Sequence, residues 1–259
     1  MMQKYLKTLF VTVSLLASAQ ASQAEDKPTI VLVHGAFADA SSWSGVISRL
    51  KADGYPVVAA ANPLRSVKTD ADYLKRIVTG IEGSVILVGH SYGGLVINDA
   101  ALNEAKVKGL VFVAAFAPEK GESAVQLSGK FPGGTLAPTL DRPVSLFDGT
   151  KDLYIQQGKF HAQFAADVPA SQASAMAATQ RPVTEQALSE PASNAAWKTI
   201  PSWFVFGDAD KNIPSEALAW MAKRAGARDT VVVKGGSHVV MVSQPQIVTK
   251  VIEDAAEGN

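Results

Sequence analysis

Hydrophobic residues along this chain fall into short, nearly unbroken runs that alternate with amphipathic stretches. Branched apolar runs of about 4–8 residues are typical of strands buried on both faces, whereas apolar positions three and four apart are typical of helices. The runs predict strands at residues 29–35, 56–63, 84–90, 107–118, 201–210 and 229–238. The stretches between them predict helices at 38–54, 70–81, 93–105 and 215–226, and a last helix from about 244. We therefore predict an α/β fold with a mostly parallel, doubly wound sheet.

The alternation stops after Pro118 and resumes near residue 199. Residues 119–198 are rich in Ala, Gln, Pro and Phe and contain no apolar run as strong as those elsewhere. Two or three short helices separated by prolines fit this segment best. An insertion of this length between strands of one sheet is an excursion from the sheet rather than a linker. We predict a core of residues 25–118 and 199–259, interrupted by a helical insertion.

The composition excludes several classes of function. The chain carries 24 basic and 24 acidic residues with no basic block, which argues against a nucleic-acid partner. It contains no cysteine, which excludes disulfides, thiolate metal sites and a cysteine nucleophile. Neither a phosphate-binding glycine fingerprint nor an HExxH metal motif occurs.

The N-terminus has the pattern of a targeting segment. Two early lysines precede an apolar stretch at 9–19, and small residues lead to Ala24. This order predicts a secretory signal peptide over residues 1–24, cleaved after Ala21 or Ala24. Its apolar stretch is shorter than the roughly 20 residues that span a bilayer. We expect an exported protein, periplasmic or secreted, without stable membrane association.

The segment SVILVGHSYGG, from Ser84 to Gly94, places a serine between glycines at the end of a predicted strand. It fits GxSxG, the sharp strand-to-helix turn that lifts a serine hydroxyl clear of a sheet. A side chain at Gly89 or Gly93 would collide with this turn or with the helix after it. Because a strand precedes the motif and a helix follows it, we predict that Ser91 is a nucleophile.

A nucleophilic serine needs a base and a group that orients the base. In this architecture the acid follows a late strand and the histidine follows the last strand. Of the four histidines, His238 alone follows the last predicted strand, so it is the predicted base. Asp208 and Asp210 both end the preceding strand, and spacing alone does not choose between them. We favour Asp210, because the later position reaches farther toward the histidine loop.

Acyl transfer also needs two backbone N–H donors for the oxyanion. One predicted donor is Tyr92, the residue after the serine. The other should come from the loop after the first strand, HGAFADASSW, where Ala36 or Phe37 supplies the N–H.

Together these elements resemble the α/β-hydrolase superfamily. The segments VLVHGAF, LVGHSYGG, DKNIP and GGSHVVMVSQP occur in the family's order and spacing. The HGA, DKxIP and HxxMxxxP elements resemble more closely the branch of plant salicylate and jasmonate methylesterases and hydroxynitrile lyases. The resemblance implies Ser91 as nucleophile, Asp210 as acid and His238 as base, with Ala36 and Tyr92 as oxyanion donors.

The resemblance also implies that residues 119–198 are the cap that roofs the substrate pocket. This chain departs from the pattern of the lyases in that branch at one position. The lyases carry a lysine directly after the catalytic histidine, whereas this chain has Val239. That difference argues against cyanohydrin cleavage. Because the insertion does not closely match the plant enzymes, their substrates are not carried over.

We therefore expect a serine hydrolase that cleaves small to medium hydrophobic carboxylic esters and needs no metal or organic cofactor. Phe37 and the insertion's Phe147, Tyr154, Phe160, Phe164 and Met176 are the candidate substrate contacts. The alternatives are the same triad acting on lactone, amide or C–C bonds, a perhydrolase, and a non-catalytic binding protein on this scaffold. The sequence does not indicate an oligomeric state.

Overall fold

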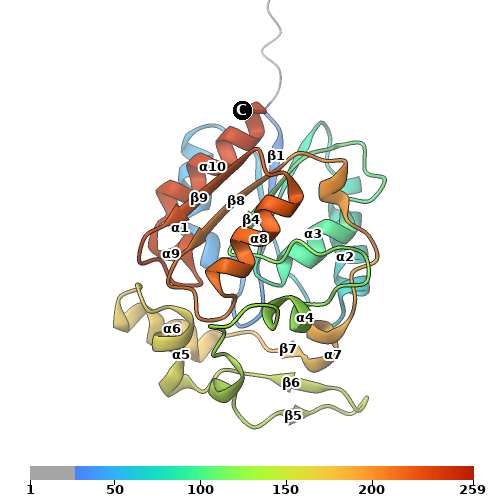
Figure 1. Ribbon diagram of the computed structural model, residues 1–259. Coiled ribbons are helices and arrows are strands. Elements are labelled where there is room, and N and C mark those ends of the chain that lie inside the picture. The colour runs from blue at the N-terminus through green and yellow to red at the C-terminus, as the bar shows by residue number, and fades with distance from the viewer. Residues whose placement is uncertain (1–26) are drawn as a thin grey trace, which may run out of the picture.

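The computed structural model describes residues 27–259, so the predicted signal peptide lies outside the described residues. Six parallel strands form the central sheet in the order β2-β1-β3-β4-β8-β9 (Figure 1). The strands are β1 (Thr29–Val33), β2 (Val57–Ala60), β3 (Val85–His90), β4 (Val107–Val113), β8 (Ser202–Gly207) and β9 (Asp229–Val233). Every residue of β1, β3 and β8 is buried, which explains their unbroken apolar runs. The predicted parallel α/β sheet is confirmed.

Helices cover both faces of this sheet (Figure 1). They are α1 (Ser44–Ala52), α2 (Val67–Thr79), α3 (Gly93–Ala100), α8 (Ser215–Ala225), α9 (Val240–Ser243) and α10 (Pro245–Glu257), and a 3₁₀ turn, η1 (Ala40–Trp43), precedes α1. Helices α1 and α10 pack together on one face, and α2 packs on α3 on the other. Among the described residues, none of the helices is both long enough and apolar enough to cross a membrane.

Local chemistry explains where several elements depart from their predicted ends. Helix α2 begins three residues early because the Ser66 hydroxyl accepts a hydrogen bond from the Thr69 N–H at 3.2 Å. Strand β4 ends at Val113, well before the predicted Pro118, because Ala114 adopts a left-handed backbone with φ 44°. Helix α8 ends at Ala225, within one residue of its predicted end, because the following Gly226 has a left-handed φ of 61°.

The insertion, residues 119–198, connects β4 to β8 and lies at the end of the sheet where the parallel strands terminate (Figure 1). Its elements are α4 (Ala124–Ser128), η2 (Ala137–Thr139), β5 (Val144–Ser145), β6 (Lys151–Leu153), α5 (Gln157–Phe164), α6 (Ala170–Thr179), β7 (Val183–Thr184), α7 (Glu185–Ser189) and η3 (Ala196–Lys198). The short helices were expected, but the antiparallel sheet β5-β6-β7 was not. Its strands have only two or three residues each, too few to produce a readable alternation.

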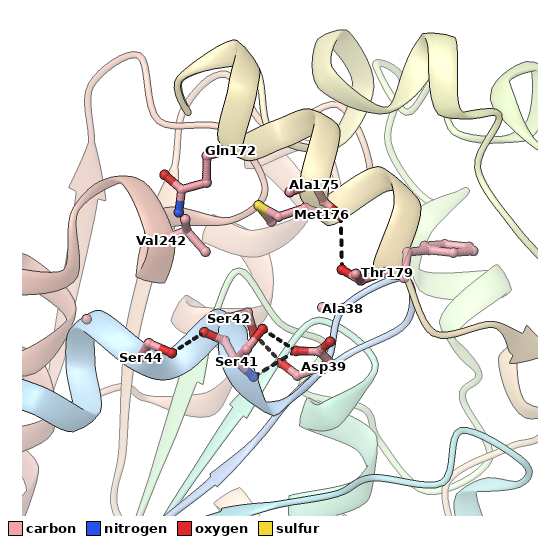
Figure 2. A pocket seen from close by; sticks show the side chains of 12 residues that line it. Ala38, Asp39, Ser41, Ser42, Ser44, Gln172, Ala175, Met176, Thr179 and Val242 are labelled. Atoms are coloured by element: carbon pink, nitrogen blue, oxygen red, sulfur yellow. Dashed lines mark hydrogen bonds between the residues drawn. The ribbon is translucent and has the colours of Figure 1, made fainter.

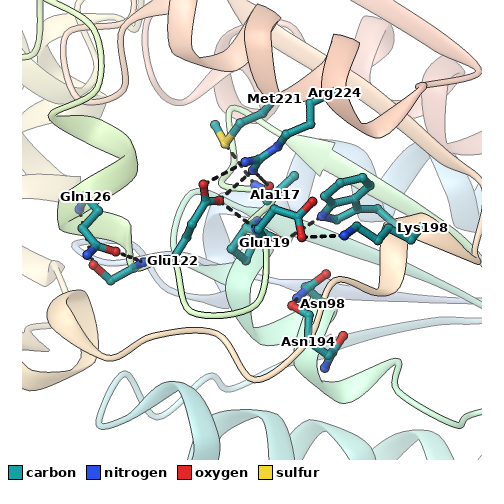
Figure 3. A network of polar contacts seen from close by, with 12 residues as sticks. Asn98, Ala117, Glu119, Glu122, Gln126, Asn194, Lys198, Met221 and Arg224 are labelled. Atoms are coloured by element: carbon teal, nitrogen blue, oxygen red, sulfur yellow. Dashed lines mark hydrogen bonds and ion pairs between the residues drawn. The ribbon is translucent and has the colours of Figure 1, made fainter.

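A polar network ties the start of the insertion to α8 (Figure 3). The Arg224 guanidinium donates to both carboxylate oxygens of Glu122 at 2.8 Å and to the Ala117 carbonyl at 2.7 Å. It also lies 4.1 Å from the centre of the Trp220 ring. Because this pair is largely buried and bidentate, it holds the insertion more firmly than a solvent-exposed ion pair would.

Candidate active site

Ser91 directly follows β3, in a strained turn. Its backbone has φ 53°, a left-handed conformation that a non-glycine residue adopts at a cost of about 1–3 kcal/mol. A Cβ at Gly89 would lie 2.6 Å from the Gly93 carbonyl oxygen, and one at Gly94 would lie 2.1 Å from the Phe116 carbonyl oxygen. A Cβ at Gly93 would instead meet the end of β1, 2.6 Å from its carbonyl oxygen. These glycines are therefore required for the backbone to close around the serine.

The structure brings His238 and Asp210 together. His238 Nδ1 donates to Asp210 Oδ2 at 2.6 Å, and both side chains are almost fully buried. The other carboxylate oxygen accepts backbone N–H bonds from Asn212 at 2.8 Å and Ile213 at 3.0 Å. With the proton on Nδ1, the lone pair of His238 Nε2 is free to accept a proton. Ser91 and His238 line the same cavity.

The alternative acid, Asp208, lies elsewhere. It is exposed, and its Oδ1 accepts the backbone N–H of Gly235 at 2.6 Å. This bond braces the glycine loop that leads to His238 but makes no contact with the imidazole. The structure therefore places Asp210 rather than Asp208 beside the predicted base.

The other three histidines bond to the backbone. The ring of His34 bonds through Nδ1 to the Gly35 carbonyl at 3.0 Å. His90 Nε2 lies 3.0 Å from the His238 carbonyl, and the two ring centres are 4.8 Å apart. Burial, and secondarily His238, lower the pKa of His90 well below its ordinary value, so this ring is neutral. His161 Nε2 bonds to the Val168 carbonyl at 2.9 Å.

The backbone N–H groups of Ala36 and Tyr92 have no acceptor among residues 27–259. Both residues line the cavity that contains Ser91. The Phe37 N–H, the alternative predicted donor, donates instead to the Arg181 carbonyl of the insertion at 3.0 Å. The geometry leaves Ala36 and Tyr92 as the pair of candidate oxyanion donors.

The cavity above Ser91 has a volume of about 520 Å³ and lies between the core and the insertion. Its walls are mainly apolar, and among residues 27–259 Glu185 alone brings a carboxylate to them. The lining residues are Ala36, Phe37, Ser91, Tyr92, Phe116, Ala124, Val125, Ser128, Gly129, Gly134, Leu136, Ala137, Leu140, Leu153, Glu185, Leu188, Ser189, Asn212, Ile213 and His238. A site of this size and character suits a small apolar molecule.

Most aromatic residues predicted to contact substrate do not line this cavity; Phe37 alone does. Phe160 and Phe164 are fully buried, and Phe164 packs against the His238 ring with centres 5.2 Å apart. Tyr154 lines a small hollow beside α6, away from Ser91, and Phe147 is fully exposed at the β5–β6 turn. The wall is formed instead by aliphatic residues of α4, η2 and α7, which are too short to show a distinct apolar face in the sequence.

A second hollow, of about 330 Å³, lies between the start of α1 and helix α6 (Figure 2). The hydroxyls of Ser41 and Ser42 in its wall donate to the Asp39 side chain and carbonyl, so their hydrogens are already engaged. Met176, a predicted substrate contact, lines this hollow. Among the described residues, Phe37 alone lines both spaces.

Among residues 27–259, no three His, Asp or Glu side chains are grouped as metal ligands. The chemistry that the described residues carry at this cavity is the serine, the paired histidine and carboxylate, and the two N–H donors.

The chain belongs to the alpha/beta hydrolase family, whose model matches residues 30–251. It is 30% identical over 251 residues to the alpha/beta hydrolase nvfD of Aspergillus novofumigatus, covering 89% of this chain and 97% of the relative. It is 29% identical over 244 residues to the alpha-hydroxynitrile lyase of Arabidopsis thaliana, covering 86% and 94%. The crystal structure of polyneuridine aldehyde esterase superposes with a TM-score of 0.75 at 21% identity over 88% of this chain and 98% of that one, a likeness of fold. The resemblance to this family and to its esterase and lyase branch is confirmed.

Proposed function

We propose that this hydrolase cleaves carboxylic esters through a Ser91–His238–Asp210 triad and an acyl-enzyme intermediate. The observation that carries the proposal is the His238–Asp210 hydrogen bond of 2.6 Å beside a serine in a strained turn. That bond orients the imidazole so that Nε2 is available to the serine, and Asp210 stabilises the imidazolium that forms.

In the proposed reaction, Ser91 Oγ attacks the ester carbonyl carbon while its proton passes to His238 Nε2. The carbonyl oxygen becomes an oxyanion, which accepts hydrogen bonds from the Ala36 and Tyr92 N–H groups. As the C–O bond breaks, His238 Nε2–H protonates the leaving alcohol. Water then attacks the acyl-enzyme by the same route, which releases the acid and restores the serine.

The cavity supports small to medium hydrophobic esters as the substrate class. Its volume of about 520 Å³ and its aliphatic walls favour acyl groups without charge. Val239, next to the proposed base, is apolar and fully buried, so the position after the histidine carries no cation. This supports hydrolysis over cyanohydrin cleavage.

The proposal is tested with a panel of p-nitrophenyl esters from acetate to palmitate, using the wild type, Ser91→Ala and Ser128→Ala. Ser128 lines the same cavity but bonds its hydroxyl to a backbone carbonyl, so it is the matched control. We expect turnover of short and middle-length esters by the wild type and Ser128→Ala. We expect at least about a 10³-fold loss in Ser91→Ala.

Labelling of Ser91 by a fluorophosphonate without turnover of any ester would contradict the ester assignment. Lactones, amides, β-diketones, cyanohydrins and peracid formation would then be assayed on the same variants. Absence of both labelling and turnover would favour a binding protein on the hydrolase scaffold.

We further propose that the protein is exported after removal of residues 1–24. The supporting pattern is an apolar stretch that two lysines precede and small residues follow. Expression of the full chain in a Gram-negative host, followed by intact-mass measurement of the periplasmic fraction, tests this. Cleavage after Ala21 or Ala24 is expected, whereas a full-length cytoplasmic product would contradict it.

A further inference from the structure

Tyr92 is bound to helix α2 by its own side chain. The residue follows Ser91 and carries a proposed oxyanion donor on its backbone, while its phenol donates to Asp70 Oδ2 at 2.9 Å. Both side chains are fully buried. The position of this N–H donor therefore depends on where α2 holds Asp70.

The chemistry of the pair keeps this bond formed. Burial, followed by the charge of Asp70, raises the pKa of Tyr92, so its phenol remains a donor. Burial also raises the pKa of Asp70, and the bonds from Tyr92 and from the Arg65 backbone N–H, at 3.1 Å, act against that increase. These hydrogen bonds satisfy the Asp70 carboxylate in its buried position.

Arg65, whose backbone N–H donates to Asp70, also holds the insertion. The Arg65 guanidinium donates to Asp152 Oδ1 at 2.6 Å and to the Pro182 carbonyl at 2.8 Å. The Thr184 hydroxyl donates to the Arg65 carbonyl at 2.6 Å. All three partners belong to β6, β7 or the residue before β7, so the small antiparallel sheet of the insertion docks on Arg65.

The start of α2 receives a second group from the insertion. Glu190, just after α7, accepts the Val67 N–H at 2.7 Å and so caps the helix from outside. Leu64, immediately before Arg65, is fully buried with a left-handed φ of 63°. The 64–67 turn is thus a constrained junction between the insertion and the helix that carries Asp70.

We propose that Asp70 and Tyr92 are positioning residues that couple the placement of the insertion to the oxyanion donor beside Ser91. The proposal rests on the proposed ester hydrolysis. The insertion forms the roof of the substrate cavity, so this path connects the roof to the atoms that stabilise the transition state. Oxyanion donors act only within a few tenths of an ångström of their place. Substitutions that break the contacts from the insertion through Arg65 and Asp70 to Tyr92 should therefore lower kcat and leave KM nearly unchanged.

The test uses Tyr92→Phe, which removes only the hydroxyl and keeps the ring and the backbone N–H. Loss of one whole donor costs about 10²- to 10³-fold in kcat, and we expect a smaller loss of about 10- to 100-fold on displacement. The specific readout is the ratio of rates on an ester and its matching thionoester. Sulfur is a weak hydrogen-bond acceptor, so this ratio measures the oxyanion site. We expect the ratio to fall in Tyr92→Phe and in Arg65→Met, with a double mutant less than additive.

Asp99→Asn is the matched control. Asp99 is a half-buried carboxylate that holds the insertion, accepting the Ser193 N–H at 2.9 Å, but its hydrogen bonds do not reach the turn at Ser91. We expect it to lose stability and to keep the wild-type ratio. A wild-type ratio in Tyr92→Phe, or an equal fall in Asp99→Asn, would overturn the proposal.

Failure of the ester assignment gives a different result. If the wild type cleaves no ester, the rate of fluorophosphonate labelling at Ser91 is measured in the same variants, because the phosphoryl oxygen uses the same donors. Slower labelling in Tyr92→Phe by about 10-fold, with Asp99→Asn unchanged, would support the positioning role without the ester substrate. Equal labelling rates in the wild type and Tyr92→Phe would refute it.

Discussion

Replacing His90 with glutamine tests how the buried histidine beside the active site affects stability. In the folded protein His90 is fully buried and donates from Nε2 to the His238 carbonyl at 3.0 Å. Glutamine offers an N–H donor of similar reach but does not titrate. Burial lowers the pKa of His90 well below 6.5, its value in an unfolded chain.

The direction in which pH changes the stability follows from proton binding to this histidine. Below pH 6.5 the unfolded chain protonates this residue and the folded protein does not, so acid favours unfolding. With the folded ring neutral, this residue's contribution to the free energy of unfolding is compared with its value at about pH 8. It falls by about 1.4 kcal/mol at about pH 5.5 and by about 2 kcal/mol at about pH 5. The His90→Gln variant lacks this contribution, so its stability should decline less in acid than that of the wild type.

Urea unfolding followed by tryptophan fluorescence at about pH 8, 6.5 and 5.5 measures the difference. We expect the stability gap between the wild type and His90→Gln to change by about 1.4 kcal/mol across this range. His161→Gln is the control, since His161 lies in the insertion and is only half-buried. A His90→Gln variant with the wild-type pH slope would refute the assignment of a neutral buried ring.

Three further predictions concern the same site. Asp210→Asn should lower kcat on p-nitrophenyl esters by about 10⁴-fold with KM little changed, whereas Asp208→Asn should stay within a few-fold; the reverse order would reassign the acid. Gly94→Ala should cost about 3 kcal/mol or more in urea unfolding, because its Cβ would lie 2.1 Å from a backbone carbonyl oxygen. Gly158→Ala, with no neighbour within 4 Å, should be neutral or stabilising by up to about 1 kcal/mol, and equal effects would contradict the steric argument. Leu188→Trp, in the cavity wall, should shorten the longest acyl chain cleaved without affecting acetate, and an unchanged chain-length profile would place the acyl group elsewhere.

Local patterns in the sequence determined the core of this protein. Buried parallel strands leave unbroken branched runs, so the sheet was readable from the chain alone. The turn at Ser91 was equally readable from the glycines at Gly89 and Gly93, where the structure leaves no room for a Cβ. Since parallel strands end at the same edge, chain order was enough to predict that His238 would lie near the strand carrying the acid.

Tertiary structure decided what local pattern does not encode. Asp208 and Asp210 share a strand end, and only the fold showed which carboxylate reaches His238. The loop after the first strand offered both Ala36 and Phe37 as donors, and only the fold brings the insertion's Arg181 carbonyl to the Phe37 N–H. Phe164, an aromatic residue of the insertion, was a candidate substrate contact from the sequence, yet in the fold it packs against the His238 ring.

The same limit applies to the insertion and to Asp70. Strands of two or three residues carry no period, so the insertion's sheet and the aliphatic wall of the cavity arise from contacts between segments distant in the chain. Asp70 reads as an ordinary acid in the first turn of a helix, and only packing buries it against Tyr92. Chemistry that depends on neighbours in sequence is visible in the chain, and chemistry that depends on neighbours in space is decided by the fold.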